Sequence, residues 1–351
     1  MHAAESRSGV SIIVPVHKGG ESFARCLDGV RATDPAPRDV VVVADGAIAE
    51  DVRIGRAAGA QVIELPDRSG PARARNVGAQ HARGDILFFV DSDVVVPADA
   101  LTHVMDAFER PSAPAALIGS YDDVPAGTTF LSQYKNLQHH YVHQRGREQA
   151  STFWGACGAI RRETFLELGG FDERYCRPCV EDIELGYRLR RAGKEIRLCH
   201  RLQVKHLKVW TAISLLEADF LYRALPWTEL ILRHRSAPND LNLNWSGRAS
   251  ACLSVLLLAG LAGAAWSPWL LAVAAGASGG LLALNASFYR FLRRRRGGWF
   301  ALRAIPWHWF YHLYSSVGFM LAVARHLLRL RAAPWLRPDR PRRPADVTAG
   351  T

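Results

Sequence analysis

The sequence predicts an α/β protein with a mostly parallel sheet, followed by an all-α region associated with a membrane. Two observations support the α/β part: strand-like apolar runs alternate with helical stretches, and one of these runs, residues 86–90, is apolar throughout. The α-helical part is predicted because residues 249–289 contain no charged side chain. With 351 residues, 49% hydrophobic and 22% charged, the chain can form one sizeable core and a further module.

Five strand-like runs precede residue 120, and helical stretches separate them. The runs lie at 10–16, 40–44, 61–65, 86–90 and 115–119, and the helical stretches include 71–82 and 97–109. Pro97 is expected near the first position of its helix, and Gly193 is expected to close a helix that begins near Glu181. This alternation predicts a Rossmann-like sheet with helices on both faces, over residues 9–207.

A helical hairpin that crosses a bilayer twice is predicted for residues 249–292. The uncharged stretch is about twice the roughly 20 residues that one crossing needs, and Trp266-Ser267-Pro268-Trp269 would form the turn. A hairpin buried in a soluble core would need apolar neighbours on every side. Arginines on both flanks, including Arg248 and 293–296, place both ends and the α/β domain on the cytoplasmic side of a cell inner membrane.

The segments around this hairpin are also expected to be helical or irregular. Residues 208–240 predict amphipathic interfacial helices, with apolar side chains at helical intervals. Residues 298–331 form a third apolar segment that is re-entrant, interfacial or spanning, and the arginines that follow it favour the first two. The ends, 1–8 and 332–351, are expected to be a flexible and a disordered tail.

Charge and cysteine content limit the classes of function. The formal net charge is +11, but no basic stripe interleaved with aromatic residues occurs outside the apolar segments, so nucleic acid is not an expected partner. The six cysteines are scattered and fit a reducing compartment. Cys176 and Cys179 form a C-x-x-C pair without the further ligands of a zinc site.

The pattern with the most chemical content is HARGDILFFVDSD, residues 81–93. Asp91 and Asp93 come directly after a strand expected to be buried on both faces, at the edge of the sheet where ligands gather in α/β proteins. Carboxylate oxygens bind Mg²⁺ or Mn²⁺ and commonly share the ion with substrate phosphates. The pair therefore predicts a divalent metal and a phosphate ester.

Three further segments carry candidate functional groups. Asp45 ends the second strand, where its carboxylate could accept a hydrogen bond from a base, although an Asp before Gly also suits a turn. Arg75 lies close to a helix start, where it could pair with phosphates. Glu181 and Asp182 begin a helix, which suits helix capping and equally suits a general base.

Taken together and in this order, these segments resemble the family 2 glycosyltransferases of the GT-A fold. The resemblance covers residues 10–207 and rests on SIIVPVHKGG, Ala44-Asp45-Gly46, ARARNVG, GDILFFVDSD, GGFDE and VEDIELGYRLRRAG. The family often has two acids before the glycine of the second strand, and here Ala44 replaces the first. The Q-x-x-R-W motif of processive synthases is absent, which implies transfer of one sugar or few.

The resemblance also implies roles for individual residues. Asp182 would be the catalytic base, with Glu181 beside it, and Asp91, Asp93 and His206 would hold the metal. The residues implied at the nucleotide sugar are Pro15, Asp45, Arg75, Asn76, Asp91 and Ser92. The donor would be a UDP- or GDP-sugar, transferred with inversion. His139, His140 and His143 are expected on a helix that lines the acceptor side.

The acceptor is expected to be a lipid or polyprenyl phosphate in cell-envelope glycan or glycolipid synthesis, because the hairpin would bring the active site to the bilayer. Two alternatives come from other classes. FFVDSDVVV also resembles the first motif of haloacid dehalogenase-type phosphatases, in which the first Asp becomes phosphorylated. The chain could also be a membrane protein that binds sugar nucleotides without turnover.

Overall fold

A computed structural model describes residues 9–328, and within them nine strands form one twisted sheet beside helices. The strand order is β3-β2-β1-β4-β8-β6-β9-β5, and β7 pairs with β9. The strands are β1 (Val10–Val16), β2 (Asp39–Asp45), β3 (Gln61–Leu65), β4 (Ile86–Val90), β5 (Val94–Val95), β6 (Ala116–Tyr121), β7 (Gln149–Ala150), β8 (Cys157–Arg161) and β9 (Ile196–His206).

The first half of the sheet is parallel, as its sequence predicts. β1 pairs with β2 and β4, and β2 pairs with β3, all in parallel. The apolar run of β4 is completely buried, which explains why it lacks the alternation of a strand with one solvated face. The second half is mixed, because β8 runs antiparallel to β4 and β6. The fold is α/β with a Rossmann-like parallel half, as expected.

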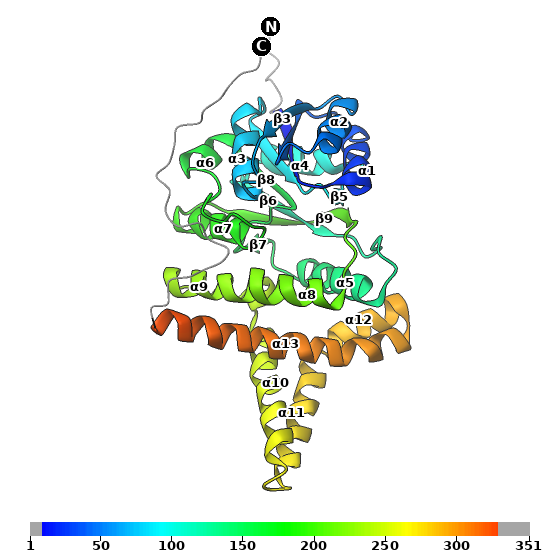
Figure 1. The fold of residues 1–351 in the computed structure, drawn as a ribbon, viewed down its shortest axis with the longest axis vertical. Coiled ribbons are helices and arrows are strands. Elements are labelled where there is room, and N and C mark those ends of the chain that lie inside the picture. The colour runs from blue at the N-terminus through cyan, green and yellow to red at the C-terminus, as the bar shows by residue number, and fades with distance from the viewer. Residues whose placement is uncertain (1–8, 329–351) are drawn as a thin grey trace.

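Helices cover both faces of this sheet (Figure 1). They are α1 (Gly20–Arg31), α2 (Ala49–Ala57), α3 (Pro71–His81), α4 (Ala100–Glu109), α5 (Phe130–Gln144), α6 (Arg162–Glu167) and α7 (Glu181–Arg191). Pro71 takes the first position of α3, and Gly193 follows α7 with a φ of 71°, a backbone conformation that glycine adopts easily. Pro97 is not at a helix start as expected: it lies in the turn before α4, where its carbonyl accepts the Ala100 N–H.

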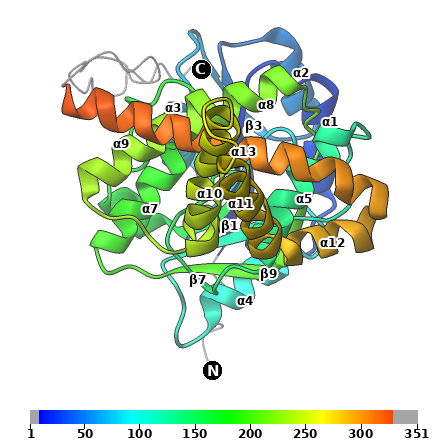
Figure 2. The same ribbon diagram turned by 90° about the horizontal axis from the view of Figure 1, so that it is seen from below.

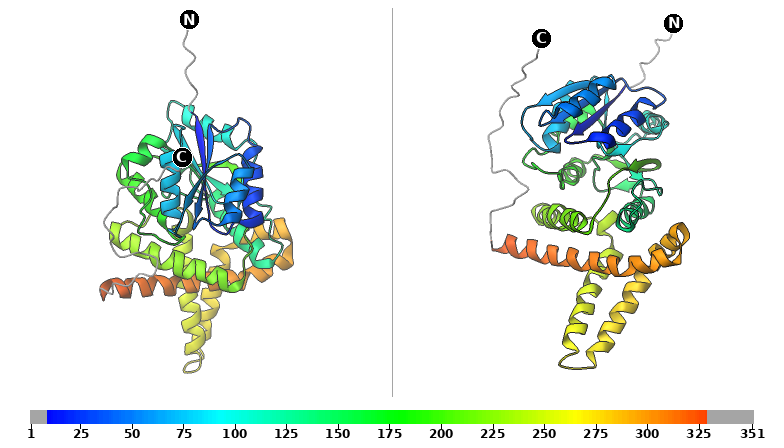
Figure 3. Two further views of the ribbon diagram at one scale, coloured as in Figure 1. Left: turned by 45° about the horizontal axis from the view of Figure 1, so that its top comes forward. Right: turned by 45° about the vertical axis from the view of Figure 1, so that its right-hand side comes forward.

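A layer of helices separates the sheet from the rest of the molecule. The predicted amphipathic segment forms α8 (Ala212–Asp219), a π-helical turn η1 (Phe220–Ala224) and α9 (Leu225–His234), followed by a short 3₁₀ turn η2 (Leu241–Leu243). Leu215 and Leu230 on these helices are buried, whereas Ile213 is 79% exposed. The segment thus has buried and exposed side chains, its interfacial position stays a prediction, and the right-hand view of Figure 3 shows it below the sheet.

An antiparallel hairpin of α10 (Trp245–Gly263) and α11 (Leu270–Leu284) projects from this body (Figures 1 and 3). Among the described residues, two helical stretches are long and apolar enough to cross a membrane, and only 17% and 22% of their most apolar windows are buried. Trp266 and Trp269 at the tip are 85% and 66% exposed. These helices would be buried if a soluble core enclosed the hairpin.

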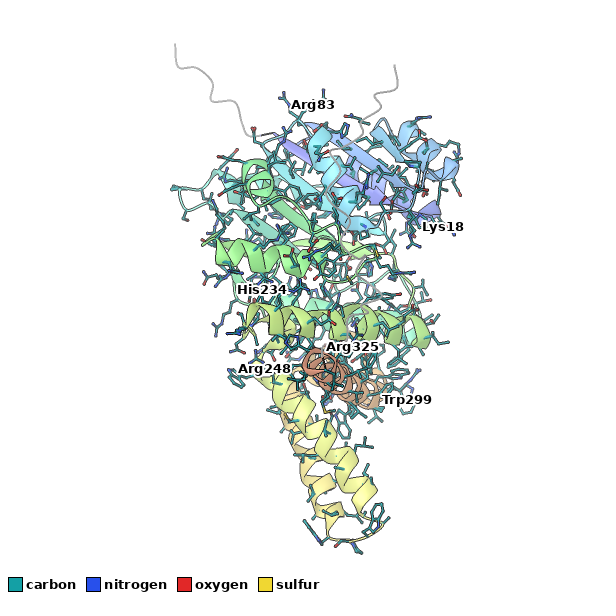
Figure 4. The ribbon with its side chains drawn as sticks, turned by 60° about the vertical axis from the view of Figure 1, so that its left-hand side comes forward. Lys18, Arg83, His234, Arg248, Trp299 and Arg325 are labelled. Carbon is teal, nitrogen blue, oxygen red and sulfur yellow. The ribbon has the colours of Figure 1, made fainter. Side chains whose placement is uncertain are left out.

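The third apolar segment forms α13 (Gly298–Leu327), which follows α12 (Ala286–Arg296). Figures 1 and 2 show α13 lying across the base of the hairpin, roughly along α8 and α9. This crosswise direction differs from that of α10 and α11, and the interfacial or re-entrant position of the segment stays a prediction. Figure 4 shows Arg248 and Arg325 at this level and Arg83 at the opposite end of the molecule. The predicted tails, 1–8 and 332–351, lie outside the described residues, as do residues 329–331 of the third segment.

Candidate active site

A cavity of about 400 Å³ opens where β4 ends, between the sheet and the layer of α8 and η1. We call it the central cavity. Its lining includes Asp91, Asp93, Asp182 and His206, four of the residues predicted from the sequence. They converge because β4, α7 and β9 all end or begin at this edge, which is the usual ligand position in α/β sheets.

Arg75 of α3 ties the predicted acids together. Its guanidinium donates to Asp91 Oδ1 at 2.7 Å and to Glu181 Oε1 at 2.9 Å, and the Arg75 side chain is 5% exposed. Burial works to lower the pKa of Arg75, but Asp91, Glu181 and Asp182 outweigh it and raise that pKa, so the guanidinium stays charged. The structure thus uses Arg75 as a buried counter-ion that positions Asp91 and Glu181 beside the cavity.

Asp93 faces His206 across the cavity floor. His206 Nε2 is 3.4 Å from Asp93 Oδ2, and the imidazole stacks on Tyr121 with ring centroids 4.3 Å apart. Burial acts to raise the pKa of Asp93, but the charge and hydrogen bond of His206 and the charge of Lys208 lower it overall. The Asp93 carboxylate is therefore kept ionised, as a metal ligand must be.

The side chains at this point of the cavity have the chemistry of ligands for a divalent cation. Carboxylate oxygens and an imidazole nitrogen suit Mn²⁺ or Mg²⁺, and Asp91, Asp93 and His206 line one cavity. Within residues 9–328, however, no three His, Cys, Asp or Glu side chains are already grouped as a metal site. Asp91 is turned toward Arg75, and Asp93 contacts His206 directly. Asp91 Oδ2 and Asp93 Oδ1 take no part in these two contacts, so each carboxylate keeps an oxygen that could bind an ion.

Asp182 is the acid best suited to take a proton. Its Oδ2 accepts the Gly155 N–H at 3.0 Å, and no cation pairs with it directly within the described part of the chain. Gly155 is needed here because a Cβ atom would lie 3.0 Å from the Arg75 guanidinium carbon. Burial, helped by the neighbouring Glu181 charge, raises the pKa of Asp182 to about 6.

Glu181, predicted beside Asp182 as catalytic, has both carboxylate oxygens in use. Oε1 accepts from Arg75, and Oε2 accepts the Cys179 N–H at 2.8 Å. The adjacent acids therefore differ in what they contact. Glu181 holds Arg75 and the 176–180 loop, whereas Asp182 faces the cavity through backbone contacts alone.

Four residues predicted at the nucleotide sugar do not line the central cavity. Asp45 accepts the backbone N–H groups of residues 69 and 70 at 2.6 and 2.8 Å, which fixes the turn before α3. Asn76 pairs with the Phe171 backbone in both directions and so holds the GGFDE loop. Pro15 lies within β1, paired with Val43, and Ser92 is half-buried between the two aspartates. Their contact with a donor stays a prediction.

The structure also brings in residues that the sequence pattern did not reveal. Lys135 of α5 and Asp219 of α8 form a buried ion pair at the end of the cavity formed by α8 and η1, with both contacts at 2.7 Å. Arg223 on the π-helical turn lines the same end. His139 lines the cavity, as expected of this helix, and burial next to His143 lowers the pKa of His139 well below its usual range. π-helical turns are frequent at functional sites, and this one could not be predicted from the sequence pattern.

Comparison with known proteins agrees with this geometry. Residues 11–169 match the model of glycosyl transferase family 2. The pre-mycofactocin glycosyltransferase of Mycobacterium tuberculosis is 27% identical over 203 residues, 55% of this chain and 41% of that protein. The glucosyl-dolichyl phosphate glucuronosyltransferase of Haloferax volcanii is 25% identical over 163 residues, 43% of this chain and 51% of that protein. The chain thus spans about half or less of these relatives.

Among solved structures, the mannosyltransferase PcManGT from Pyrobaculum calidifontis, in complex with GDP-Man and Mn²⁺, superimposes with a TM-score of 0.54 at 19% identity. The match covers 90% of this chain and 88% of that one, so the likeness of fold extends beyond the sheet. The fold is of the GT-A type, as in this neighbour. Residues 11–169 form a domain of the glycosyl transferase family 2 type, which supports a glycosyltransferase.

Proposed function

We propose that this protein transfers one sugar, with inversion, from a nucleotide-sugar donor to a lipid-linked acceptor at the inner face of the cell membrane. The observation that carries the proposal is the composition of the central cavity. Its sheet side presents the aspartates that follow β4, and its other side is formed by α8 and η1, which face the membrane-proximal half of the molecule. Donor and acceptor would therefore meet between the sheet and the bilayer.

The donor side is supported by charge. Arg68, Arg177 and Lys208 line the central cavity, and cationic side chains of this kind stabilise a diphosphate. PcManGT was solved with GDP-Man and Mn²⁺. We infer a UDP- or GDP-sugar for this chain as well, with Asp91 and Ser92 at its diphosphate and sugar.

Asp93 and His206, with Asp91, would hold a divalent cation. When bound, such an ion stabilises the charge that develops on the departing nucleoside diphosphate. The protein's own contribution is to keep Asp93 ionised beside His206, and to hold Asp91 in place through Arg75. Loss of Asp93 should therefore remove transfer without unfolding the domain.

Asp182 would act as the general base. With a pKa of about 6 its carboxylate is mostly ionised at neutral pH and still basic enough to take a proton from an acceptor hydroxyl. Glu181 would position Arg75 beside it. A polyprenyl phosphate acceptor needs less help, because a phosphate monoester has a second pKa of about 6 and is largely ionised near neutral pH.

The lipid-linked acceptor is supported by the helices below the cavity. α10 and the stretch Leu270–Arg296, which joins α11 and α12, are long and apolar enough to span a bilayer, and α13 lies crosswise at the base of the hairpin. The name of the Haloferax volcanii relative includes a dolichyl phosphate, a lipid phosphate of the proposed kind. Arg248 and 293–296 flank the hairpin and favour a cytoplasmic catalytic domain.

The test is transfer of radiolabel from a panel of UDP- and GDP-sugars, with Mn²⁺ or Mg²⁺, into the organic-extractable fraction of membranes that contain the protein. Asp93→Asn is the test variant, and Asp28→Asn, on the exposed face of α1, is the matched control. Label in lipid with the native and control proteins, and none with Asp93→Asn, is the expected result. Label only in soluble acceptors would refute the lipid-linked acceptor.

The two other classes predict different outcomes. The family match and the GT-A-type fold speak against a haloacid dehalogenase-type phosphatase, which would form a phosphoaspartate at Asp91. A non-catalytic sugar-nucleotide-binding protein would bind donors without transfer, and Asp182→Asn would change nothing. A measurable rate that falls in Asp182→Asn therefore separates an enzyme from a sensor.

A further inference from the structure

A second cavity, of about 670 Å³, lies between α5 and α12, away from the predicted catalytic residues. We call it the arginine cavity, because Arg145, Arg290, Arg294 and Arg295 line it. The rest of its lining is polar or aromatic, and among the described residues no acidic side chain contributes to it. A concave site with several cations and no carboxylate among its lining residues is suited to an anion.

Tertiary contacts hold the two walls of the arginine cavity together. Tyr141 on α5 donates its hydroxyl proton to Ser287 Oγ on α12 at 2.7 Å, and this contact is partly buried. The His140 ring stacks on Phe291 with centroids 5.8 Å apart. Figure 2 shows α12 beside α5 when the molecule is viewed from the hairpin side. The cavity is thus part of the folded body and is not formed by surface side chains alone.

The charge in this cavity is only partly balanced. Arg295 forms an ion pair with Asp123 at 2.7 Å, and Arg145 lies over the Tyr141 ring at 5.5 Å. Arg290 and Arg294 are exposed, and within residues 9–328 no carboxylate lies within ion-pair distance of either. Two guanidinium groups therefore remain to bind an anion, with Arg145 beside them.

The position of the cavity indicates where that anion comes from. Arg290 and Arg294 lie on α12, which begins directly after α11, the second helix of the apolar hairpin. If the hairpin spans the bilayer, residues at this junction are at the depth of the lipid headgroups. A phosphate fixed in a headgroup would be present there at high local concentration, and guanidinium groups bind phosphate through paired N–H donors.

We propose that the arginine cavity binds the phosphate of an anionic phospholipid headgroup at the cytoplasmic surface of the membrane. This inference rests on the proposed insertion of the hairpin, but it concerns a site separate from the central cavity. The two cavities lie on different faces of α5, because His139 lines the central cavity and His140 lines the arginine cavity. One helix would therefore contact both the acceptor side of the active site and a bound lipid.

Native mass spectrometry of the full-length protein, purified in detergent and titrated with phosphatidylglycerol or phosphatidylcholine, tests the proposal. We expect the native protein to bind phosphatidylglycerol more tightly. Arg290→Gln/Arg294→Gln should weaken that binding about thirtyfold, since each cation near an anionic lipid contributes roughly a factor of five. Phosphatidylcholine binding should not change.

Two further variants test whether altered membrane insertion or a general loss of positive charge explains the weaker binding. Arg145→Gln changes the same cavity from α5, outside the hairpin, so a roughly fivefold loss would not reflect altered membrane insertion. Arg25→Gln/Arg31→Gln removes two exposed arginines from α1, which contributes no residue to the arginine cavity, and should have no effect.

Each contrary result refutes a defined statement. Equal binding of both lipids, or an unchanged affinity in Arg290→Gln/Arg294→Gln, would overturn the lipid site. Displacement of phosphatidylglycerol by an equal concentration of inorganic phosphate would show a site for free phosphate instead. Failure of the native protein to sediment with membranes would contradict the proposed membrane anchoring itself, and sugar transfer measured in detergent would test the catalytic proposal independently of either.

Discussion

The pH dependence of transfer should reveal Asp182 directly. Burial and the charge of Glu181 raise the Asp182 pKa from an ordinary 3.8 to about 6, whereas Arg75 and Arg223 act against this rise. A base with a pKa of about 6 is about 90% ionised at pH 7 and about 10% ionised at pH 5. Because only the ionised carboxylate accepts a proton, kcat/KM should fall about tenfold as the pH is lowered from 7 to 5.

An aspartate with an ordinary pKa would give a different profile. With a pKa of 3.8 it would remain more than about 90% ionised at pH 5, and the rate would be nearly flat over this range. Asp182→Asn should remove the acid limb and lower kcat/KM for a hydroxyl acceptor by about 10²- to 10⁴-fold, the usual contribution of a general base. Initial rates at subsaturating acceptor, from pH 5 to 8, measure both effects.

A phosphate acceptor would also titrate near pH 6, so a second variant is needed to assign the limb. Glu181→Gln removes the charge that raises the Asp182 pKa, so it should move the midpoint to lower pH. A limb caused by the acceptor would not move. A flat profile down to pH 5, or the same midpoint in Glu181→Gln, would refute the assignment of Asp182 as the base.

Three further predictions concern stability and metal binding. Arg75→Gln leaves two carboxylates without their buried counter-ion and should lower the free energy of unfolding by about 3–5 kcal/mol. As a control, Arg56→Gln removes one partner of an exposed ion pair and should lower the free energy of unfolding by about 1 kcal/mol or less. Equal losses of thermal stability in the two variants would contradict the role of Arg75 as a buried counter-ion. Asp93→Asn should weaken Mn²⁺ binding at least about tenfold in a calorimetric titration of the folded protein, and an unchanged affinity for Mn²⁺ would exclude Asp93 as a ligand. Lys135→Met should lower the free energy of unfolding by a similar amount, about 3–5 kcal/mol, because Asp219 stays buried without its cation. Lys135→Met/Asp219→Asn should regain part of that stability in the same thermal assay, and no gain would argue against the ion pair.

The parallel half of the sheet was predictable because burial on both faces leaves a clear mark on the sequence. β4 is an unbroken apolar run, and the neighbouring strand β1 is apolar except for one serine and one proline. β9 and β8 were not predicted. Buried and half-buried or exposed positions are interspersed along β9, so its charged and apolar residues alternate too irregularly to identify a strand, and β8 is short and contains a glycine.

The site residues were predictable for a related reason, but their partners were not. Asp91 and Asp93 directly follow a strand, and the carboxyl end of such a strand is a ligand position. Arg75 pairs with acids 16 and 106 positions away, and Asn76 with a loop 95 positions away. No local pattern encodes these distances, so the sequence could not reveal that Arg75 holds two acids at the cavity and that Asn76 holds the GGFDE loop.

The order of layers gives these separate findings a common direction. From the sheet outward come the aspartates after β4, the central cavity, α8 with η1, then α13, and finally the apolar hairpin (Figure 3). At the end of the cavity that α8 and η1 form, Lys135 is tied to Asp219 and Arg223 lies on a π-helical turn, a local irregularity that is frequent at functional sites. If the hairpin spans a bilayer as proposed, a lipid phosphate that approaches from that side would meet this end first, with Asp182 and the donor site beyond it. In that arrangement the hairpin would set the distance of the cavity from the membrane, and α13 would set its orientation.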